Sequence, residues 1–122
     1  MATTGEWRAA AEQSRGEGML SLLQAELDAS TGCLFLLDEP EAALSPQRQM
    51  ALLCLLDDIA RDGRSQVVMA THSPLLIAHP GADVLWLDGG GATRTAFAET
   101  EHWRLMRRLM ADPQGFVGRI LG

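Results

Sequence analysis

The feature that most restricts the fold is a pair of short apolar runs separated by one long amphipathic segment. The runs cover residues 33–37 and 66–70. Uninterrupted apolar runs of this length predict strands buried on both faces, as in a parallel sheet. Residues 46–62 predict a helix, for which Ser45 is the expected N-cap and Gly63 the stop. This order of elements predicts parallel pairing through a right-handed crossover.

Other segments extend the pattern in both directions. Apolar residues at helical spacing predict a helix over about 17–29, whereas residues 1–13 are weakly patterned. Downstream, the sequence predicts a short helix over 74–78, a strand over 84–87, a hairpin partner over 93–98, an amphipathic helix over 100–110 and a final helix after Pro113. We expect one α/β domain over residues 1–122, with a short, mainly parallel sheet flanked by helices and a C-terminal β-hairpin plus helix.

Helical spacing also predicts which side chains are buried. The apolar face of the helix over 46–62 is expected to comprise Leu52, Leu53, Leu56, Ile59 and Ala60. The apolar side expected for the helix over 100–110 comprises Trp103, Met106, Leu109 and Met110. Cys33 and Cys54 lie within apolar runs, which predicts small buried residues in a reducing compartment and no structural zinc.

Composition limits the chemistry. The 122 residues include ten in the Lys+Arg count, and all ten are arginine, so the sequence contains no lysine. This excludes Schiff-base chemistry, pyridoxal-phosphate catalysis and the lysine of a phosphate-binding loop within these residues. A net charge of −6 disfavours binding to nucleic acid or to an anionic membrane through net charge alone. With no apolar run of membrane-spanning length and no signal-peptide pattern, we expect a cytoplasmic protein.

Two acidic residues directly follow the first apolar run. Asp38 and Glu39 are expected at the carboxyl end of a buried strand, where open α/β sheets bind ligands. One carboxylate there can hold Mg²⁺ against nucleotide phosphates, and a second can polarise an attacking water. The alternative is a strand that ends in a solvated Asp-Glu turn, and the dipeptide by itself favours that alternative.

A histidine follows the second apolar run. Because neighbouring parallel strands end at the same edge of a sheet, His72 is expected beside Asp38 and Glu39. An imidazole there can donate a hydrogen bond to a γ-phosphate or orient the attacking water. The alternative, in which His72 caps the next helix or binds a backbone carbonyl, is disfavoured once the acidic pair is considered.

A third candidate site precedes the first predicted helix. Ser14 offers a hydroxyl group, Gly16 offers a backbone amide, and Glu17 begins the helical pattern. Such groups at a helix N-terminus bind anions. The alternative is a simple helix start, which these residues favour when taken in isolation.

Taken in order, these motifs resemble those of an ABC-type ATPase. Residues 14–17 (SRGE) resemble the signature motif, 34–39 (LFLLDE) the Walker B strand with its catalytic glutamate, 40–45 (PEAALS) the D-loop, and His72 the switch histidine. The stretches DEPEAALSP and ATHSPLL are most similar to the predicted stand-alone AAA/ABC-type ATPases of bacteria. The resemblance covers about residues 12–112 and implies part of a P-loop NTPase fold.

The resemblance implies a role for each matching residue. Asp38 would support Mg²⁺, Glu39 would be the general base, and His72 would contact the γ-phosphate of ATP. Such ATPases act as head-to-tail pairs, so the partner would be a second copy or a chain that carries the Walker A half. The residues that would reach the ATP of the opposed subunit are Ser14, Gly16 and Glu17.

Two departures from the family pattern stand out. The signature has Gln13 in place of the usual leucine, and Arg15 in place of a small residue or histidine. A phosphate loop is also missing from these residues. The glycine cluster at 89–91 has no Lys-Ser/Thr after it, and its position predicts a hairpin turn.

Three interpretations remain open. The chain is an ABC-type ATP hydrolase that binds Mg·ATP weakly by itself; or it is a catalytically silent interaction module that donates its signature face to a partner; or it is a truncated fragment, with residues 1–13 as a remnant. A fragment would expose an edge of the strand at 34–37 or 67–70, which predicts marginal stability or association.

Other residues give weaker signals. His79 is expected in a loop. His102 lies near Glu99 and Glu101 and could be a metal ligand, but a place at a solvated helix start is favoured. The last amphipathic segment carries three arginines, Arg104, Arg107 and Arg108. They could form a basic patch that contacts a partner or nucleic acid, but a solvated helix face is favoured.

Overall fold

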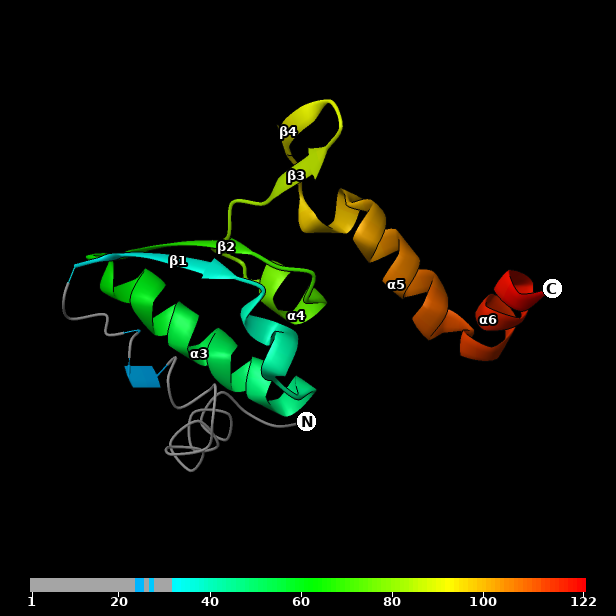
Figure 1. Cartoon of the computed structure of the whole chain (residues 1–122), viewed down its shortest axis with the longest axis horizontal. Helices are drawn as coiled ribbons and strands as arrows, with labels where there is room; N and C mark the ends of the chain where they lie inside the picture. The colour runs from blue at the N-terminus through cyan, green and yellow to red at the C-terminus, as the bar shows by residue number, and fades with distance from the viewer. Residues whose placement is uncertain (1–23, 26, 28–31) are drawn as a thin grey trace. The chain divides into compact units, whose positions relative to one another are not determined.

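A computed structural model describes residues 24, 25, 27 and 32–122. Its elements are β1 (Leu34–Asp38), η2 (Pro40–Ala43), α3 (Pro46–Asp62), β2 (Gln66–Ala70), α4 (Pro74–Ile77), β3 (Leu85–Asp88), β4 (Gly91–Arg94), η3 (Phe97–Glu99), α5 (Glu101–Ala111) and α6 (Pro113–Leu121) (Figure 1). The chain forms two compact units, which meet in the sequence between Gly81 and Ala82. The expectation of a single domain stays a prediction.

The helix expected over 17–29 lies mostly outside the described residues. Within that range the structure describes Gln24 and Ala25, which are helical, and Leu27, which is buried.

The first unit contains the predicted parallel strand pair. β1 and β2 lie side by side, with Phe35 opposite Val67 and Leu37 opposite Met69 (Figure 1). The crossover between them is α3, so the strand–helix–strand prediction is confirmed. Parallel pairing places the carboxyl ends of both strands at one edge of the sheet, which is where the candidate residues follow.

The ends of α3 form as the sequence predicts. The Ser45 hydroxyl accepts a hydrogen bond from the backbone N–H of Arg48 at 3.3 Å, and Pro46 is the first helical residue. At the other end Gly63 adopts a left-handed φ of 77° while its N–H donates to the carbonyl of Ile59 at 3.2 Å. Glycine reaches this conformation without the steric cost of a Cβ, which explains why the helix stops there.

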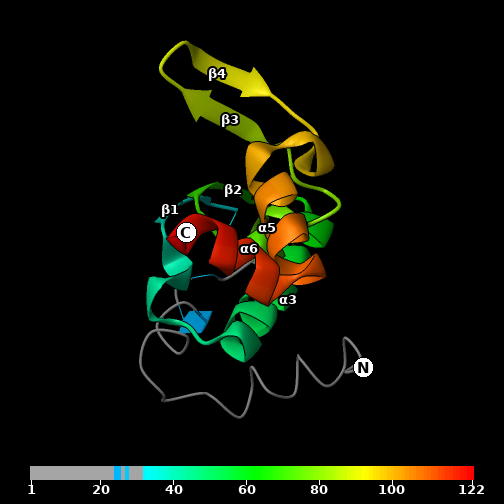
Figure 2. The same ribbon diagram turned by 90° about the vertical axis from the view of Figure 1, so that its right-hand side faces the viewer.

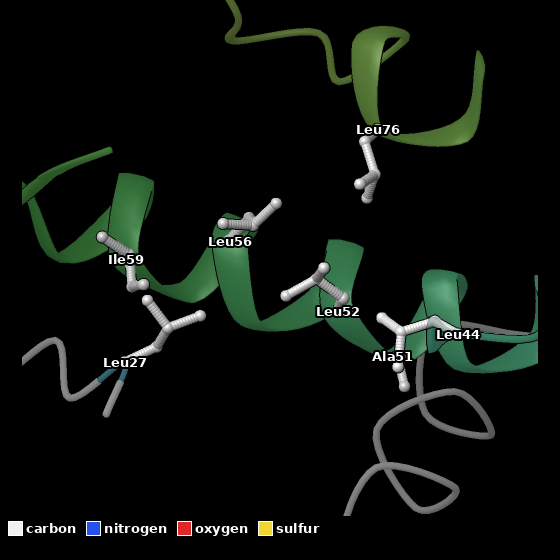
Figure 3. Packing of buried hydrophobic residues seen from close by; sticks show 7 residues of the cluster. All are labelled: Leu27, Leu44, Ala51, Leu52, Leu56, Ile59 and Leu76. Carbon is white, nitrogen blue, oxygen red and sulfur yellow. The ribbon is translucent and has the colours of Figure 1, made fainter. Parts of the chain in front are cut away.

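The core of the first unit lies between α3 and the elements around it. Figure 3 shows Leu76 of α4 directed at α3 near Leu52, and Leu27 directed at Ile59. Leu52 and Leu76 are 0% and 1% exposed, so they are the most completely buried large side chains of the described residues. The buried cluster comprises Leu27, Leu44, Ala51, Leu52, Leu56, Ile59 and Leu76. The same cluster supports one face of the sheet, through Phe35, Leu37, Val67 and Met69.

The prediction that both strands are buried on both faces is wrong for this chain. Leu34 is 59% exposed, Leu36 is 71% exposed and Val68 is 52% exposed. These three side chains alternate with the half-buried ones, so they lie on the face opposite α3. Continuous apolar sequence indicates that both faces of a strand tolerate burial, but the covering element must come from elsewhere in the tertiary or quaternary structure. We call the three residues the open sheet face.

The second unit contains a hairpin followed by helices. β3 and β4 pair antiparallel, with Trp86 opposite Thr93, as the paired arrows in Figure 2 show. The predicted C-terminal hairpin is therefore confirmed, and β3 and β4 form a two-stranded sheet of their own. β4 begins at Gly91, earlier than predicted, because the turn occupies only Gly89 and Gly90.

The C-terminal helices follow the sequence closely. The Thr100 hydroxyl caps α5 by accepting from the backbone N–H of Trp103 at 3.1 Å, and the Trp103 ring packs against Phe97. α6 follows Pro113 as predicted, and Phe116 is buried against α5 with the Arg108 guanidinium 5.5 Å from its ring centroid. Among the described residues, no helix is both long enough and apolar enough to span a bilayer.

Three individual burial predictions are wrong. Ala60 is exposed, and Ala51 is buried in its place because α3 is rotated slightly from the expected face. Met110 is 72% exposed, and no residue of α5 is fully buried. Cys33 is exposed because it lies just before β1, outside the paired strand, and Cys54 is half-buried; no disulfide joins them.

Candidate functional site

The carboxyl ends of β1 and β2 bring together the residues that the sequence singled out. Asp38 is the last residue of β1 and pairs with Ala70, the last residue of β2. Two residues beyond Ala70, the His72 ring places Nε2 at 3.2 Å from Oε1 of Glu39. The acidic pair and the histidine therefore lie at the same edge of the sheet, as predicted.

The backbone at Glu39 changes direction immediately after the strand. Its N–H donates to the carbonyl of Ala70 at 2.7 Å, which extends the sheet pairing by one residue. Its own backbone then adopts φ 47° and ψ 55°, the only left-handed conformation of a non-glycine residue within the described part of the chain. Such a conformation costs about 1–3 kcal/mol and tends to occur at functional sites. It directs the chain into η2 and keeps the Glu39 carboxylate at the strand end.

A second carboxylate reaches the same histidine from the other side of Pro40. Oε1 of Glu41 accepts a hydrogen bond from the backbone N–H of His72 at 2.8 Å. Burial acts to raise the pKa of the Glu41 carboxyl. The hydrogen bonds from the backbone N–H groups of His72 and of Glu41 itself, from the Thr71 hydroxyl, and the attraction of the His72 ring outweigh burial and lower that pKa below its ordinary value of 4.5.

The turn after β2 is also tied to α3. The Ser73 hydroxyl donates to Oε1 of Gln49 at 2.6 Å, and Nε2 of Gln49 donates to the carbonyl of Leu44 at 3.2 Å. Ser73 is 4% exposed and caps α4 by accepting from the N–H of Leu76. Sequence reasoning did not identify Glu41 and Gln49 as site residues, because contacts between distant segments leave no local pattern.

The acidic pair and the histidine are open to solvent. The His72 side chain is 83% exposed and that of Glu39 is 53% exposed. An exposed polar contact of this kind contributes about 0–1 kcal/mol to stability, because water screens the interaction and the side chains lose entropy. The contact therefore contributes little to holding the fold, and its position at the strand ends is better explained by chemistry than by stability.

The donor set is suited to Mg²⁺ only in part. Asp38 and Glu39 offer carboxylate oxygens, the ligand type that Mg²⁺ prefers. Within residues 24, 25, 27 and 32–122, no group of three or more His, Cys, Asp or Glu side chains could hold a metal ion. A magnesium ion at this edge would therefore take its other ligands from nucleotide phosphates and water, as Mg²⁺ does in nucleotide sites.

His79 has a structural role, in agreement with its expected position in a loop. Its Nε2 lies 3.1 Å from Oδ1 of Asp57, and its Nδ1 accepts from the N–H of Gly81 at 3.0 Å. Asp57 also accepts from Nε of Arg61 at 2.7 Å. Burial acts to raise the pKa of Asp57, but its bonds to Arg61 and His79 outweigh this and lower that pKa. The contacts among Asp57, Arg61 and His79 attach the loop after α4 to α3.

The remaining candidates are placed as follows. The three signature residues Ser14, Gly16 and Glu17 lie outside the described residues, so their assignment stays a prediction. Arg104, Arg107 and Arg108 are exposed on α5. His102 is half-buried in the first turn of α5, which does not match the solvated position expected for it.

Comparison with known proteins is consistent with the strand-end geometry. No curated protein and no solved structure matches the chain. One family does match, over residues 2–78, and that range includes β1, α3, β2 and the Glu39–His72 contact. At the level of this family, the match indicates a nucleotide-binding, ATPase-like function. Because the match covers well over half of the chain, this protein belongs to the family described as "AAA domain, putative AbiEii toxin, Type IV TA system".

Proposed function

We propose that this chain supplies the water-activating part of an ABC-type site that hydrolyses ATP to ADP and phosphate. The observation that carries the proposal is the 3.2 Å contact between Glu39 and His72 at the carboxyl ends of two parallel strands. Membership of a AAA family supports a nucleotide as the substrate. Asp38, at the end of β1, would be the residue that holds Mg²⁺.

In this mechanism Glu39 is the general base. The His72 ring, whose Nε2 lies 3.2 Å from Oε1, would position the carboxylate and leave Oε2 to accept a proton from the attacking water. The exposed His72 ring would also contact the γ-phosphate, as the resemblance implies. Mg²⁺, when bound with the nucleotide, would neutralise charge on the phosphates. Hydrolysis of this kind depends mainly on positioning and charge stabilisation.

The proposed site needs groups that the 122 residues do not contain. The sequence has no lysine, and it has no glycine loop followed by Lys-Ser/Thr. The exposure of Glu39 and His72 indicates that water must be excluded by another surface. We therefore propose that the phosphate loop comes from a polypeptide segment other than these 122 residues, on a partner chain. The signature residues Ser14, Gly16 and Glu17 would face the ATP of the opposed subunit.

The test is a reconstituted assay of phosphate release from Mg·ATP. The chain is mixed with the polypeptide that carries a Gly-Lys-Ser/Thr loop, encoded in frame upstream or in a neighbouring gene. We expect Glu39→Gln to lower turnover at least 100-fold, since it removes the general base. Glu99→Gln in η3, an exposed glutamate of the second unit, is the matched control and should leave turnover unchanged.

Two outcomes would decide against this mechanism. Turnover that is insensitive to Glu39→Gln would remove Glu39 from its role as the base. Mg·ATP binding that promotes assembly without any phosphate release would instead support the second candidate, a catalytically silent module that donates its signature face to a partner. The open sheet face favours this second candidate, because its exposed apolar side chains could be covered by a partner.

A further inference from the structure

The His72 ring can serve Glu39 only if the turn that carries it is held in register with the end of β1. Two anchors act on this turn. One is the bond from Ser73 to Gln49 of α3, and the other is the bond from the His72 backbone N–H to Glu41. The Gln49 anchor acts on the residue after the histidine, at the start of α4. The Glu41 anchor acts on the histidine itself.

Glu39 and Glu41 hold the same histidine at two points. Glu39 meets the imidazole at 3.2 Å, and Glu41 meets the backbone N–H at 2.8 Å. Both carboxylates belong to the short segment that turns through the left-handed conformation of Glu39 and into η2. Because the two contacts fix the backbone and the ring of one residue, they define where Nε2 lies relative to the strand end.

We propose that Glu41 is a positioning residue: its carboxylate holds the His72 backbone so that the imidazole meets Glu39. This inference rests on the proposed function, in which the pair activates water. The electrostatics agree with it, because a carboxylate that receives backbone N–H groups is favoured in its charged form. Hydrogen bonds to a charged acceptor are also about twice as strong as neutral ones.

The test uses nuclear magnetic resonance on the full chain without nucleotide, so that it is independent of catalysis. The measured quantity is the displacement of the His72 ring resonances caused by Glu39→Gln. We expect Glu41→Ala to reduce this displacement at least twofold, because the ring no longer meets Glu39. Glu41→Gln keeps an oxygen acceptor at the same place and should restore most of the displacement. Glu99→Ala is the control and should leave it unchanged.

A second measurement keeps the inference testable if Glu41→Ala does not fold. Hydrogen exchange of the His72 amide should accelerate about fivefold in Glu41→Gln, since a neutral acceptor replaces a charged one. The Glu39 amide, which donates to Ala70, serves as an internal control and should keep its rate. Equal acceleration of both amides would indicate general loosening and would overturn the assignment.

An unchanged ring displacement in Glu41→Ala would also overturn it, and would show that Ser73 and Gln49 hold the turn without Glu41. Failure of the proposed function is a separate result. If the ring displacement depends on Glu41 while the reconstituted assay shows no hydrolysis, the positioning contact stands and the catalytic role of the pair is wrong.

Discussion

The imidazole of His72 lies within 3.2 Å of the Glu39 carboxylate, although one side chain follows β2 and the other follows β1. Parallel pairing of the two strands produces this contact, because it brings their carboxyl ends to one edge of the sheet. The contact is exposed, so its energetic value to the fold is small and its value to a reaction depends on a surface that closes over it.

The first prediction concerns the purified chain by itself. We expect turnover of Mg·ATP close to the uncatalysed background, because the amides and lysine of a phosphate loop are absent from these residues. Each charge-assisted hydrogen bond that is missing costs about 1.5–3 kcal/mol of binding or stabilisation. Phosphate release is the measurement, and rapid release that Glu39→Gln abolishes would contradict the prediction.

Loss of the Glu39–His72 contact should leave the stability of the chain almost unchanged. Both side chains are exposed, so Glu39→Gln and His72→Gln should each change the free energy of unfolding by less than about 1 kcal/mol. Urea unfolding followed by circular dichroism measures this change. A loss of several kcal/mol would mean that the pair is a structural element, and would weaken its assignment to catalysis.

The two serine caps of the first unit should differ in importance. Ser73→Ala removes a cap and leaves Oε1 of half-buried Gln49 without its donor, which should cost about 2 kcal/mol. Ser45→Ala is the matched control: it removes an exposed cap and should cost about 1 kcal/mol. The urea midpoints of the two variants test the order, and equal losses would contradict it.

Acid should weaken the attachment of the loop after α4 to α3. The pKa of Asp57 is lower in the folded chain than its ordinary value of 3.8, so folding favours the charged carboxylate. Its contribution to stability is therefore complete above about pH 3.8 and is lost as the pH falls through the lower folded value. Asp57→Asn should remove this part of the pH dependence, whereas Glu99→Gln should keep it. The free energy of unfolding is measured between neutral and acidic pH. The same pH dependence in Asp57→Asn and in the unchanged chain would contradict this assignment.

The open sheet face should drive association of the chain at high concentration. Leu36 is 71% exposed beside Val68, and exposed apolar patches next to unpaired strand edges promote contact between molecules. We expect Leu36→Thr to shift size-exclusion and light-scattering profiles toward the monomer. Leu87→Thr, at an equally exposed position on the hairpin, is the control. Association that responds to Leu87→Thr alone would place the contact on the second unit.

Much of the local structure could be predicted from the sequence. Ser45, Pro46 and Gly63 define the limits of α3 because capping and backbone conformation are properties of a few neighbouring residues. The two apolar runs predicted β1 and β2, and their order along the chain predicted parallel pairing, which placed His72 beside Glu39. This part of the site was predictable because it requires only the direction of two strands.

The tertiary structure decided which partners each element has. The sequence does not indicate that Glu41 holds the His72 backbone, or that one face of β1 and β2 is exposed. These contacts depend on the relative positions of segments that are far apart in the chain, and apolar residues tolerate several such arrangements. The sequence alone determined one point more firmly than the fold does: without lysine, the chain lacks the phosphate-binding residue that the proposed reaction needs.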